Sequence, residues 1–192
     1  MDLALAFEDS QPFKLTVEQY QALAEAGAFD EQNGRVELIE GMIVCMSPQA
    51  SAHTVLCFEL AVRLREALRQ LGSPYTALTT PTVAMPPHNA PDPDIAVTTL
   101  PKLGPGYFPL QGVRILIEIS RTTLNKDMRI KRDIYARAGV PEYWVVDVRR
   151  ALVHRFWQPS DGAYRQEPPI PLAGLLTSLS LPDLVIDGSG IL

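Results

Sequence analysis

Three ionisable residues stand in segments whose other residues are typical of a protein interior. Asp94 stands at the head of the apolar run 95–97, and Glu118 stands inside the apolar run 115–119. Lys131 lies in a helix-like segment further along the chain. A buried charge is unfavourable unless it is paired or binds a metal ion. Two carboxylates and one ammonium in this setting therefore indicate a functional site.

Helix geometry tests the place of Lys131. We predict a helix over residues 127–138, ended by Gly139 and the following Pro141. At about 100° per residue from Met128, Lys131 falls near 300°, within the apolar arc of this helix. A lysine on an inward face often extends past the edge of the core. The alternative is that it points at a negative group near the sheet, and we predict its ammonium within about 5 Å of Glu118.

Two carboxylates from neighbouring strands with a lysine beside them describe a divalent-cation site. Hard oxygen ligands suit Mg²⁺ or Mn²⁺, and Mg²⁺ commonly takes one or two carboxylates together with waters and substrate phosphate. A plain Glu118–Lys131 ion pair and an ordinary edge position for Asp94 are the structural alternatives.

Charge and composition limit the function classes. The chain has 192 residues, 46% of them hydrophobic, and a formal net charge of −5, which argues against a general nucleic-acid coat. The segment 113–150 nevertheless holds nine Lys or Arg against five Asp or Glu. A local basic surface of this kind could hold phosphates, although a solvated helix face explains any single arginine.

Localisation follows from the cysteines and the apolar runs. Cys45 and Cys57 form no CxxC pair and are interpreted as buried thiols in a reducing cytoplasm. The N-terminus is acidic where a signal peptide would be basic, and no apolar run is long enough to span a membrane. A cytoplasmic protein without membrane contact is expected.

The remaining elements follow from caps, turns and alternation. Thr16 begins a capping box, and Glu40-Gly41 indicates a two-residue hairpin turn. Ser47-Pro48 predicts the start of a long helix that ends near Leu71. We predict a mixed sheet with 95–97, 115–119 and 143–146 as neighbouring strands. An N-terminal arm (1–14), a single domain (15–192) and a β-rich C-terminal extension complete the prediction.

The ordered set of motifs resembles a known family. Pro93-Asp94, Glu118-Ile119-Ser120, Lys131 and the segment from Ala138 to Asp147 resemble the PD-(D/E)XK nuclease superfamily. The likeness is closest to its bacterial branch of restriction-endonuclease-like proteins, long catalogued as a domain of unknown function, and covers roughly residues 15–185. The resemblance implies an α/β fold with a restriction-endonuclease-like mixed β-sheet flanked by helices, with extra β-strands at the C-terminus.

The resemblance also assigns roles to residues. It implies that Asp94, Glu118 and the Ile119 carbonyl hold Mg²⁺ (or Mn²⁺), with Glu37 as an additional acid or a plain strand acid. The superfamily places its lysine two residues after the acid, where this chain has Ser120, so Lys131 resembles its substitute.

The positions of two further polar residues indicate structural roles. His53 is interpreted first as a core or capping residue, and Asp127 first as an acid at a helix N-terminus.

Three functions remain open at this level. The first is a Mg²⁺-dependent endonuclease that hydrolyses DNA phosphodiester bonds. The second is a catalytically inactive nuclease-fold binding or assembly module, and the third is a phosphohydrolase of nucleotides. The family resemblance implies a homodimer or higher oligomer, and the aromatic residues on late strands (Tyr143, Trp144, Phe156, Trp157) suggest an interface for it.

Overall fold

The computed structural model describes residues 12–32, 34–100 and 106–191. Most of the predicted arm (1–14) therefore lies outside the described residues. Within the described ranges, no helix combines the length and hydropathy needed to cross a membrane.

The helical segments are few, and one long helix dominates. They are α2 (Val17–Glu25), α3 (Ser51–Gln70), a 3₁₀ turn (Leu110–Gly112), α4 (Leu124–Lys126), a π-helical turn (Asp127–Lys131) and α5 (Arg132–Arg137). The strands are β1 (Val36–Ile39), β2 (Met42–Cys45), β3 (Tyr75–Thr79), β4 (Val83–Ala84), β5 (Ile95–Thr99), β6 (Phe108–Pro109), β7 (Val113–Ser120), β8 (Glu142–Asp147), β9 (Leu152–Ser160), β10 (Ala163–Gln166), β11 (Ile170–Pro171), β12 (Leu175–Thr177) and β13 (Val185–Asp187).

The main sheet has the order β10-β9-β8-β7-β5-β3, with β11 added against β9. Strands β7 and β8 are parallel, and the helical segment α4–α5 connects them, as a parallel crossover requires. The other neighbours along this order pair antiparallel. The predicted adjacency of the three central strands and the mixed α/β fold with extra C-terminal strands are both confirmed.

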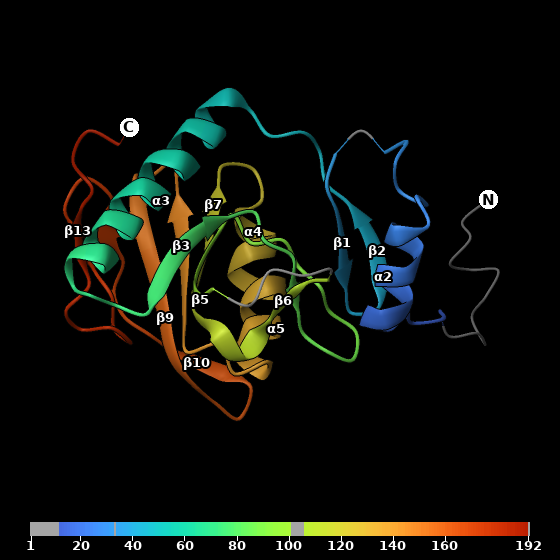
Figure 1. Ribbon diagram of the computed structural model, residues 1–192. Helices are drawn as coiled ribbons and strands as arrows, with labels where there is room; N and C mark the ends of the chain where they lie inside the picture. The colour runs from blue at the N-terminus through green and yellow to red at the C-terminus, as the bar shows by residue number, and fades with distance from the viewer. Residues whose placement is uncertain (1–11, 33, 101–105, 192) are drawn as a thin grey trace.

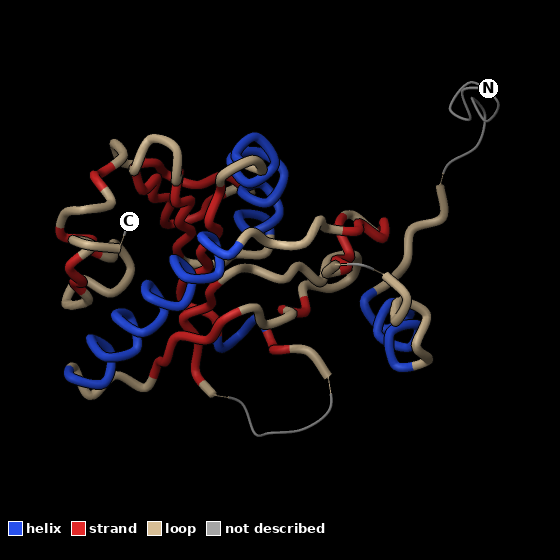
Figure 2. The backbone as a smooth tube through the Cα atoms, turned by 90° about the horizontal axis from the view of Figure 1, so that it is seen from above, coloured by secondary structure: helices blue, strands red, loops and turns tan. Residues whose placement is uncertain are grey.

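Helices cover the two faces of this sheet (Figures 1 and 2). Successive side chains of a strand point to opposite faces, so Ile115, Ile117 and Ile119 pack under α3 while Leu116 packs under α5. Glu118 shares the face of Leu116 by the same alternation. The carboxylate of a central strand is therefore directed toward the helix that carries Lys131.

Both central helices begin at positions other than those predicted. The start predicted at Ser47-Pro48 is wrong, because Ala50 is still extended (φ −70°, ψ 150°) and α3 begins at Ser51. The Gln49 side chain donates to Asp94, which holds this stretch out of the helix. The second helix begins at Leu124, before the predicted Asp127, and passes through a π-helical turn that ends at Lys131.

The N-terminal hairpin β1–β2 and helix α2 lie beside the main sheet (Figure 1). The predicted capping box is confirmed, because Thr16 Oγ1 accepts from the Gln19 amide at 3.3 Å and Gln19 Oε1 accepts from the Thr16 amide at 2.9 Å. The hairpin turn at Glu40-Gly41 is also confirmed. The prediction of two buried thiols is wrong for Cys45, which is exposed because the pattern of β2 turns it outward.

The late aromatic side chains belong to the core. Tyr143, Trp144 and Phe156 are at most 1% exposed, and Trp157 is half-buried. Stacking of Tyr143 on Phe156 fills the layer between the sheet and α5. The use of this aromatic area as a reason for dimer formation is therefore wrong.

Glu142 fastens the C-terminal extension to the sheet. Its fully buried carboxylate accepts from Trp144 Nε1 and Ser178 Oγ, each at 2.6 Å, and from the amides of Leu179 and Ser180. Ser178, Leu179 and Ser180 belong to the connection between β12 and β13, and this hairpin packs beneath α3. One acid on a central strand thus orders a segment that has little regular structure of its own.

We predict that Glu142→Ala lowers the free energy of unfolding by at least about 3 kcal/mol, because several buried donors lose their acceptor at about 1–3 kcal/mol each. Urea unfolding followed by tryptophan fluorescence measures the loss. The exposed control Glu31→Ala should change stability by less than about 0.5 kcal/mol. Equal stability of the two variants would contradict this role of Glu142.

Candidate active site

Lys131 is the buried centre of the site. Its side chain is 2% exposed, and its Nζ donates to Glu118 Oε1 and to Glu37 Oε1, each at 2.8 Å. The predicted approach of Lys131 to Glu118 is thus confirmed. The π-helical turn that ends at Lys131 changes the rotation per residue, yet the side chain still faces the sheet. One ammonium joins two acids from different parts of the fold.

Glu118 projects from the middle of β7 toward α5. Its Oε1 also accepts from the Tyr135 hydroxyl at 2.9 Å. Among the described residues, no donor bonds its Oε2, and Glu118 lines a cavity of about 510 Å³. One carboxylate oxygen is thus anchored, while the other is available to a ligand.

Asp94 lies next to Glu118 because Ile95 pairs with Ile117 across β5 and β7. Its Oδ2 accepts from the Ile119 amide at 2.8 Å and lies 3.0 Å from His53 Nε2. Its Oδ1 accepts from Gln49 Nε2 at 2.8 Å and from the Arg35 guanidinium at 3.1 Å. Both Asp94 oxygens therefore have partners from the protein itself.

Glu37 stands on β1, behind Lys131 as seen from the cavity. Its carboxylate is fully buried and accepts from Lys131, from the Asp92 amide at 3.1 Å and from Lys126 at 3.5 Å. Glu37 does not line the cavity, whereas Asp94, Glu118, Ile119 and Lys131 do. Its contacts hold Lys131 and tie the N-terminal hairpin to the core.

Ser120 occupies the position where the superfamily motif has its lysine. Its hydroxyl donates to Asp127 Oδ2 at 2.7 Å, and Thr123 donates to the same oxygen at 2.6 Å. Asp127 is 2% exposed and lines the cavity, so it is more than an exposed acid at a helix start. The short Ser120 side chain leaves the space beside Glu118 to Lys131.

Several site residues were not predicted from the sequence. His53, interpreted first as a core or capping residue, contacts Asp94 and has a buried Nδ1 without a partner among the described residues. Arg35 and Gln49 carried no sequence signal, because they belong to loops. Tyr135 stood in the apolar arc of the helix, where a tyrosine hydroxyl needs a buried partner, and this could have identified it.

Burial and ion pairing set the charge states. Burial raises the pKa of Glu118 to about 8. The charge of Lys131 opposes this effect, and the nearby carboxylates of Asp127, Asp94 and Glu37 add to it. Burial works against the charge of Lys131, yet Glu118 and Glu37 outweigh it and hold the pKa of Lys131 above its ordinary value. The lysine is therefore a permanent cation that two acids share.

The pKa of Asp94 moves in the opposite direction to that of Glu118. Burial alone would raise it, but His53, the Ile119 amide and Arg35 together bring the pKa of Asp94 below its ordinary value. Asp94 is thus ionised at neutral pH. Burial raises the pKa of the nearby Asp92 to about 6.

The cluster holds more acids than bases. Five carboxylates are buried in it, and three cationic side chains lie against them. The acids are Glu37, Asp92, Asp94, Glu118 and Asp127; the cations are Lys131, Lys126 and Arg35. Such an excess of buried acidic groups favours binding of a further cation, which would relieve the unfavourable burial that raises the pKa of Glu118.

The oxygen ligands fit a hard divalent ion such as Mg²⁺ or Mn²⁺, for which one or two carboxylates can suffice. No group of three His, Cys, Asp or Glu in the described ranges converges as a complete metal cage. The fit is therefore to an ion that keeps waters or takes substrate oxygens.

We predict that Lys131→Met lowers the free energy of unfolding at about pH 7 by about 3–5 kcal/mol, because Glu118 and Glu37 lose their buried partner. In this variant the pKa of each acid is higher in the folded state than in the unfolded state. At pH values between these two pKa values the folded state binds more protons than the unfolded state, so stability falls as pH rises. Part of the loss should return at about pH 5.

Urea unfolding of Lys131→Met at both pH values checks this prediction. The control is Lys126→Met, whose side chain is 24% exposed and whose Nζ lies 3.5 Å from Glu37. Its loss should be no more than about 1 kcal/mol. Similar losses in both variants, or no pH dependence for Lys131→Met, would contradict the shared-ammonium arrangement.

Comparison with known proteins identifies the family. The chain is similar to a solved structure from Anabaena variabilis, described as a "putative nuclease belonging to DUF820", with a TM-score of 0.65 and 18% identity over 92% of this chain and 97% of that chain. At this identity the likeness establishes the fold alone. No curated protein sequence matches significantly. A sequence model of the Uma2 family, described as "Putative restriction endonuclease", matches residues 17–188, so the protein belongs to this family.

Proposed function

We propose that the protein is a Mg²⁺- or Mn²⁺-dependent endonuclease that hydrolyses phosphodiester bonds in DNA. The observation that carries the proposal is the meeting of Asp94 and Glu118, from adjacent strands, with the buried Lys131 at one cavity. Membership of a restriction-endonuclease family supports nuclease chemistry. Asp94, Glu118 and Lys131 are the proposed catalytic residues.

Asp94, Glu118 and the Ile119 carbonyl would hold the cation. A divalent ion in such a site polarises the phosphate and lowers the pKa of bound water. Glu37, named from the resemblance as a further ligand, keeps its contacts to Lys131, Lys126 and the Asp92 amide. In this proposal Glu37 orients Lys131.

Lys131 contributes a fixed positive charge at the wall of the cavity. Because Glu37 and Glu118 both bind its ammonium, the side chain is ordered before substrate arrives. A preorganised cation stabilises the charge that develops on a phosphate in the transition state without rearrangement of the protein. The ammonium would do the work of the lysine that the superfamily motif places at the position of Ser120.

A catalytically inactive binding or assembly module is the second candidate function. The observation that favours it is that both Asp94 oxygens are already bonded, to Arg35, Gln49, His53 and the Ile119 amide. A site whose acid is fully paired can be stable without a cation. Self-association of the chain stays a prediction of the family resemblance and applies to either function.

We predict that Asp94→Asn and Glu118→Gln abolish cleavage of plasmid DNA and weaken Mn²⁺ binding, because each removes one carboxylate charge from the ligand set. Lys131→Ala should retain most of the Mn²⁺ affinity but slow cleavage by about 30- to 1000-fold, as the loss of about 2–4 kcal/mol of transition-state stabilisation implies. Calorimetry and a nuclease assay with Mg²⁺ or Mn²⁺ measure the two effects.

The exposed Asp161→Asn is the matched control and should behave like the wild type. Thermal melts establish which variants are folded at the assay temperature. A parallel assay on RNA and nucleotides separates a DNA nuclease from a nucleotide phosphohydrolase. If the wild type binds no divalent cation at about millimolar concentration, the enzyme proposal is wrong and the binding module replaces it.

We predict that Arg35→Gln binds Mn²⁺ about tenfold more tightly than the wild type, a difference of about 1.4 kcal/mol. Arg35 places a positive charge 3.1 Å from Asp94 Oδ1 and so competes with any cation for that oxygen. Calorimetry without DNA measures the affinity, with Arg63→Gln as control because Arg63 bonds carbonyls of Asp187 and Ser189. A weaker affinity in Arg35→Gln would mean that Arg35 supports the ligand set.

A further inference from the structure

Two arginines extend the candidate site along one edge of the sheet. Strands β7 and β8 are parallel and in register from Ile115 with Glu142 to Ser120 with Asp147, so their carboxyl ends lie side by side. The Val148 amide donates to the Ser120 carbonyl at 3.1 Å and continues the pairing by one step. Arg121 follows Ser120, and Arg149 follows Val148. They are far apart in sequence and adjacent in the fold.

The same two arginines line three neighbouring cavities. They belong to the wall of the candidate active site and to two further cavities of about 270 and 330 Å³. The first of these also includes Asn125 and Arg150, and the second includes His53. Arg121 and Arg149 are therefore the link between the catalytic cavity and the surface on either side of it.

Charge pairing distinguishes these arginines from the other bases of the site. Arg35 pairs with Asp94, and Lys131 pairs with Glu118 and Glu37. Arg121 and Arg149 are exposed, and in the described part of the chain their side chains form no hydrogen bond or ion pair. Their charges are thus not neutralised by the carboxylates of the site and are available to an anion.

The turn that presents Arg149 is held in place by its neighbour. Asp147, at the end of β8, accepts from the Arg150 amide at 3.1 Å and from its guanidinium at 2.9 Å. The pairing of Arg150 with Asp147 leaves Arg149 as the unpaired arginine of this turn in the described structure. An ordered turn reduces the entropy lost when Arg149 binds a ligand.

We propose that Arg121 and Arg149 bind the backbone phosphates next to the phosphate held in the catalytic cavity, on a nucleic-acid duplex that crosses the carboxyl edge of β7 and β8. This inference rests on the proposed function and adds the binding track to it. No Phe, Tyr or Trp side chain lines the three cavities within the described residues, so the surface lacks a large aromatic platform for stacking unpaired bases. Contacts to phosphates alone make binding independent of base sequence.

Binding without cleavage tests the proposal. Fluorescence anisotropy of a labelled DNA duplex of about 20 base pairs, in EDTA, gives the affinity of the full chain between about 50 and 200 mM salt. The slope of log K against log salt concentration should fall in magnitude by about 0.9 in Arg121→Ala and by about the same amount in Arg149→Ala. Each variant lacks one phosphate contact, so its binding releases fewer counterions. The double variant should lose about twice that amount.

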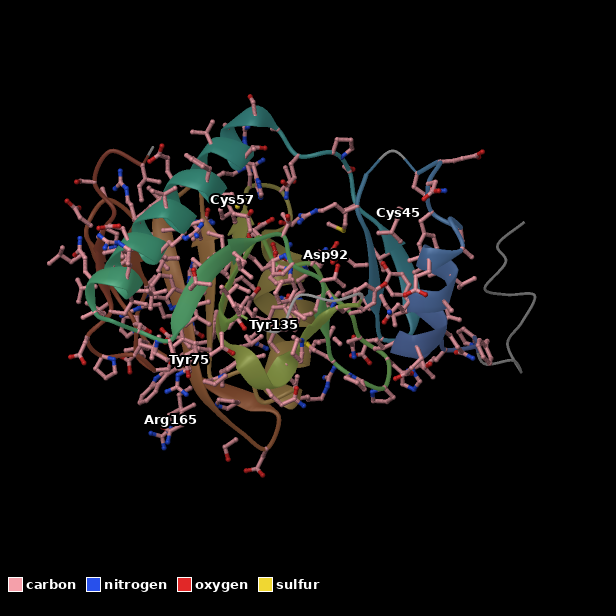
Figure 3. All side chains as sticks on the ribbon, viewed as in Figure 1. Cys45, Cys57, Tyr75, Asp92, Tyr135 and Arg165 are labelled. Carbon is pink, nitrogen blue, oxygen red and sulfur yellow. The ribbon has the colours of Figure 1, made fainter. Side chains whose placement is uncertain are left out.

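The matched control is Arg165→Ala, in the edge strand β10. Figure 3 shows Arg165 in a different part of the molecule from the labelled Asp92 and Cys57, which contact Glu37 and Asp94 of the site. Its slope should match that of the wild type. Equal slopes for Arg165→Ala and the two track variants would overturn the proposal, as would tighter binding of a single strand that neither track variant weakens. Failure of the wild type to bind the duplex would also overturn it.

The binding assay and the nuclease assay together separate this inference from the proposed function. If the salt slope decreases in the track variants as predicted but the wild type cleaves no DNA with Mn²⁺, the binding track stands and the nuclease proposal fails. If the wild type cleaves DNA and the track variants keep its affinity and slope, the nuclease proposal stands and the track is wrong.

Discussion

The structure depends on one ammonium that is buried between two carboxylates. Lys131 comes from the helix that crosses between β7 and β8, Glu118 from the central strand of the sheet, and Glu37 from the N-terminal hairpin. Glu37 is 94 residues from Lys131 along the chain, and Glu118 is 13 residues from it on a different element, so the ion triad requires all three elements to assemble correctly. Burying such a group without its partners would cost more than the pairing returns. The triad therefore stabilises the native arrangement of these elements relative to arrangements that leave the charges unpaired.

The remaining polar contacts of the site extend this arrangement outward in layers. Ser120 and Thr123 anchor Asp127, and the loop before α3 supplies Gln49 to Asp94. The hydrophobic layers on either side of the sheet hold these groups in place, because Glu118 lies between the apolar neighbours Ile117 and Ile119. A rigid apolar frame around a polar centre is the condition for preorganised charge.

The acids of the molecule divide into two kinds by their partners. Glu142 has donors on both oxygens and is closed off from solvent, and its work is to attach the C-terminal extension. Glu118 keeps one oxygen directed to a cavity, and burial, helped by the nearby carboxylates, raises its pKa. Both are buried glutamates on central strands. Only the environment of their oxygens separates a structural acid from a candidate ligand.

The sequence by itself determined the architecture and the centre of the site. Two-residue alternation and uniformly apolar runs identified the central strands, and helical periodicity placed Lys131 on the inward face near Glu118. These are local patterns, and the physical rule behind each applies within a few residues. The family resemblance then ordered Asp94, Glu118 and Lys131 into one site, and the family itself is confirmed.

Only the tertiary structure decided which other side chains meet there. Arg35, Gln49 and His53 reach Asp94 from three segments whose separations of 41 to 59 residues carry no periodic signal. Tyr143 and Phe156 lie in the core because α5 packs over their face of the sheet, a contact that no strand pattern specifies. Register and helix packing bring Arg121 beside Arg149 in the same way. Long-range contacts depend on how whole elements pack. The residues that determine this packing are spread over the chain, so no local sequence pattern specifies these contacts.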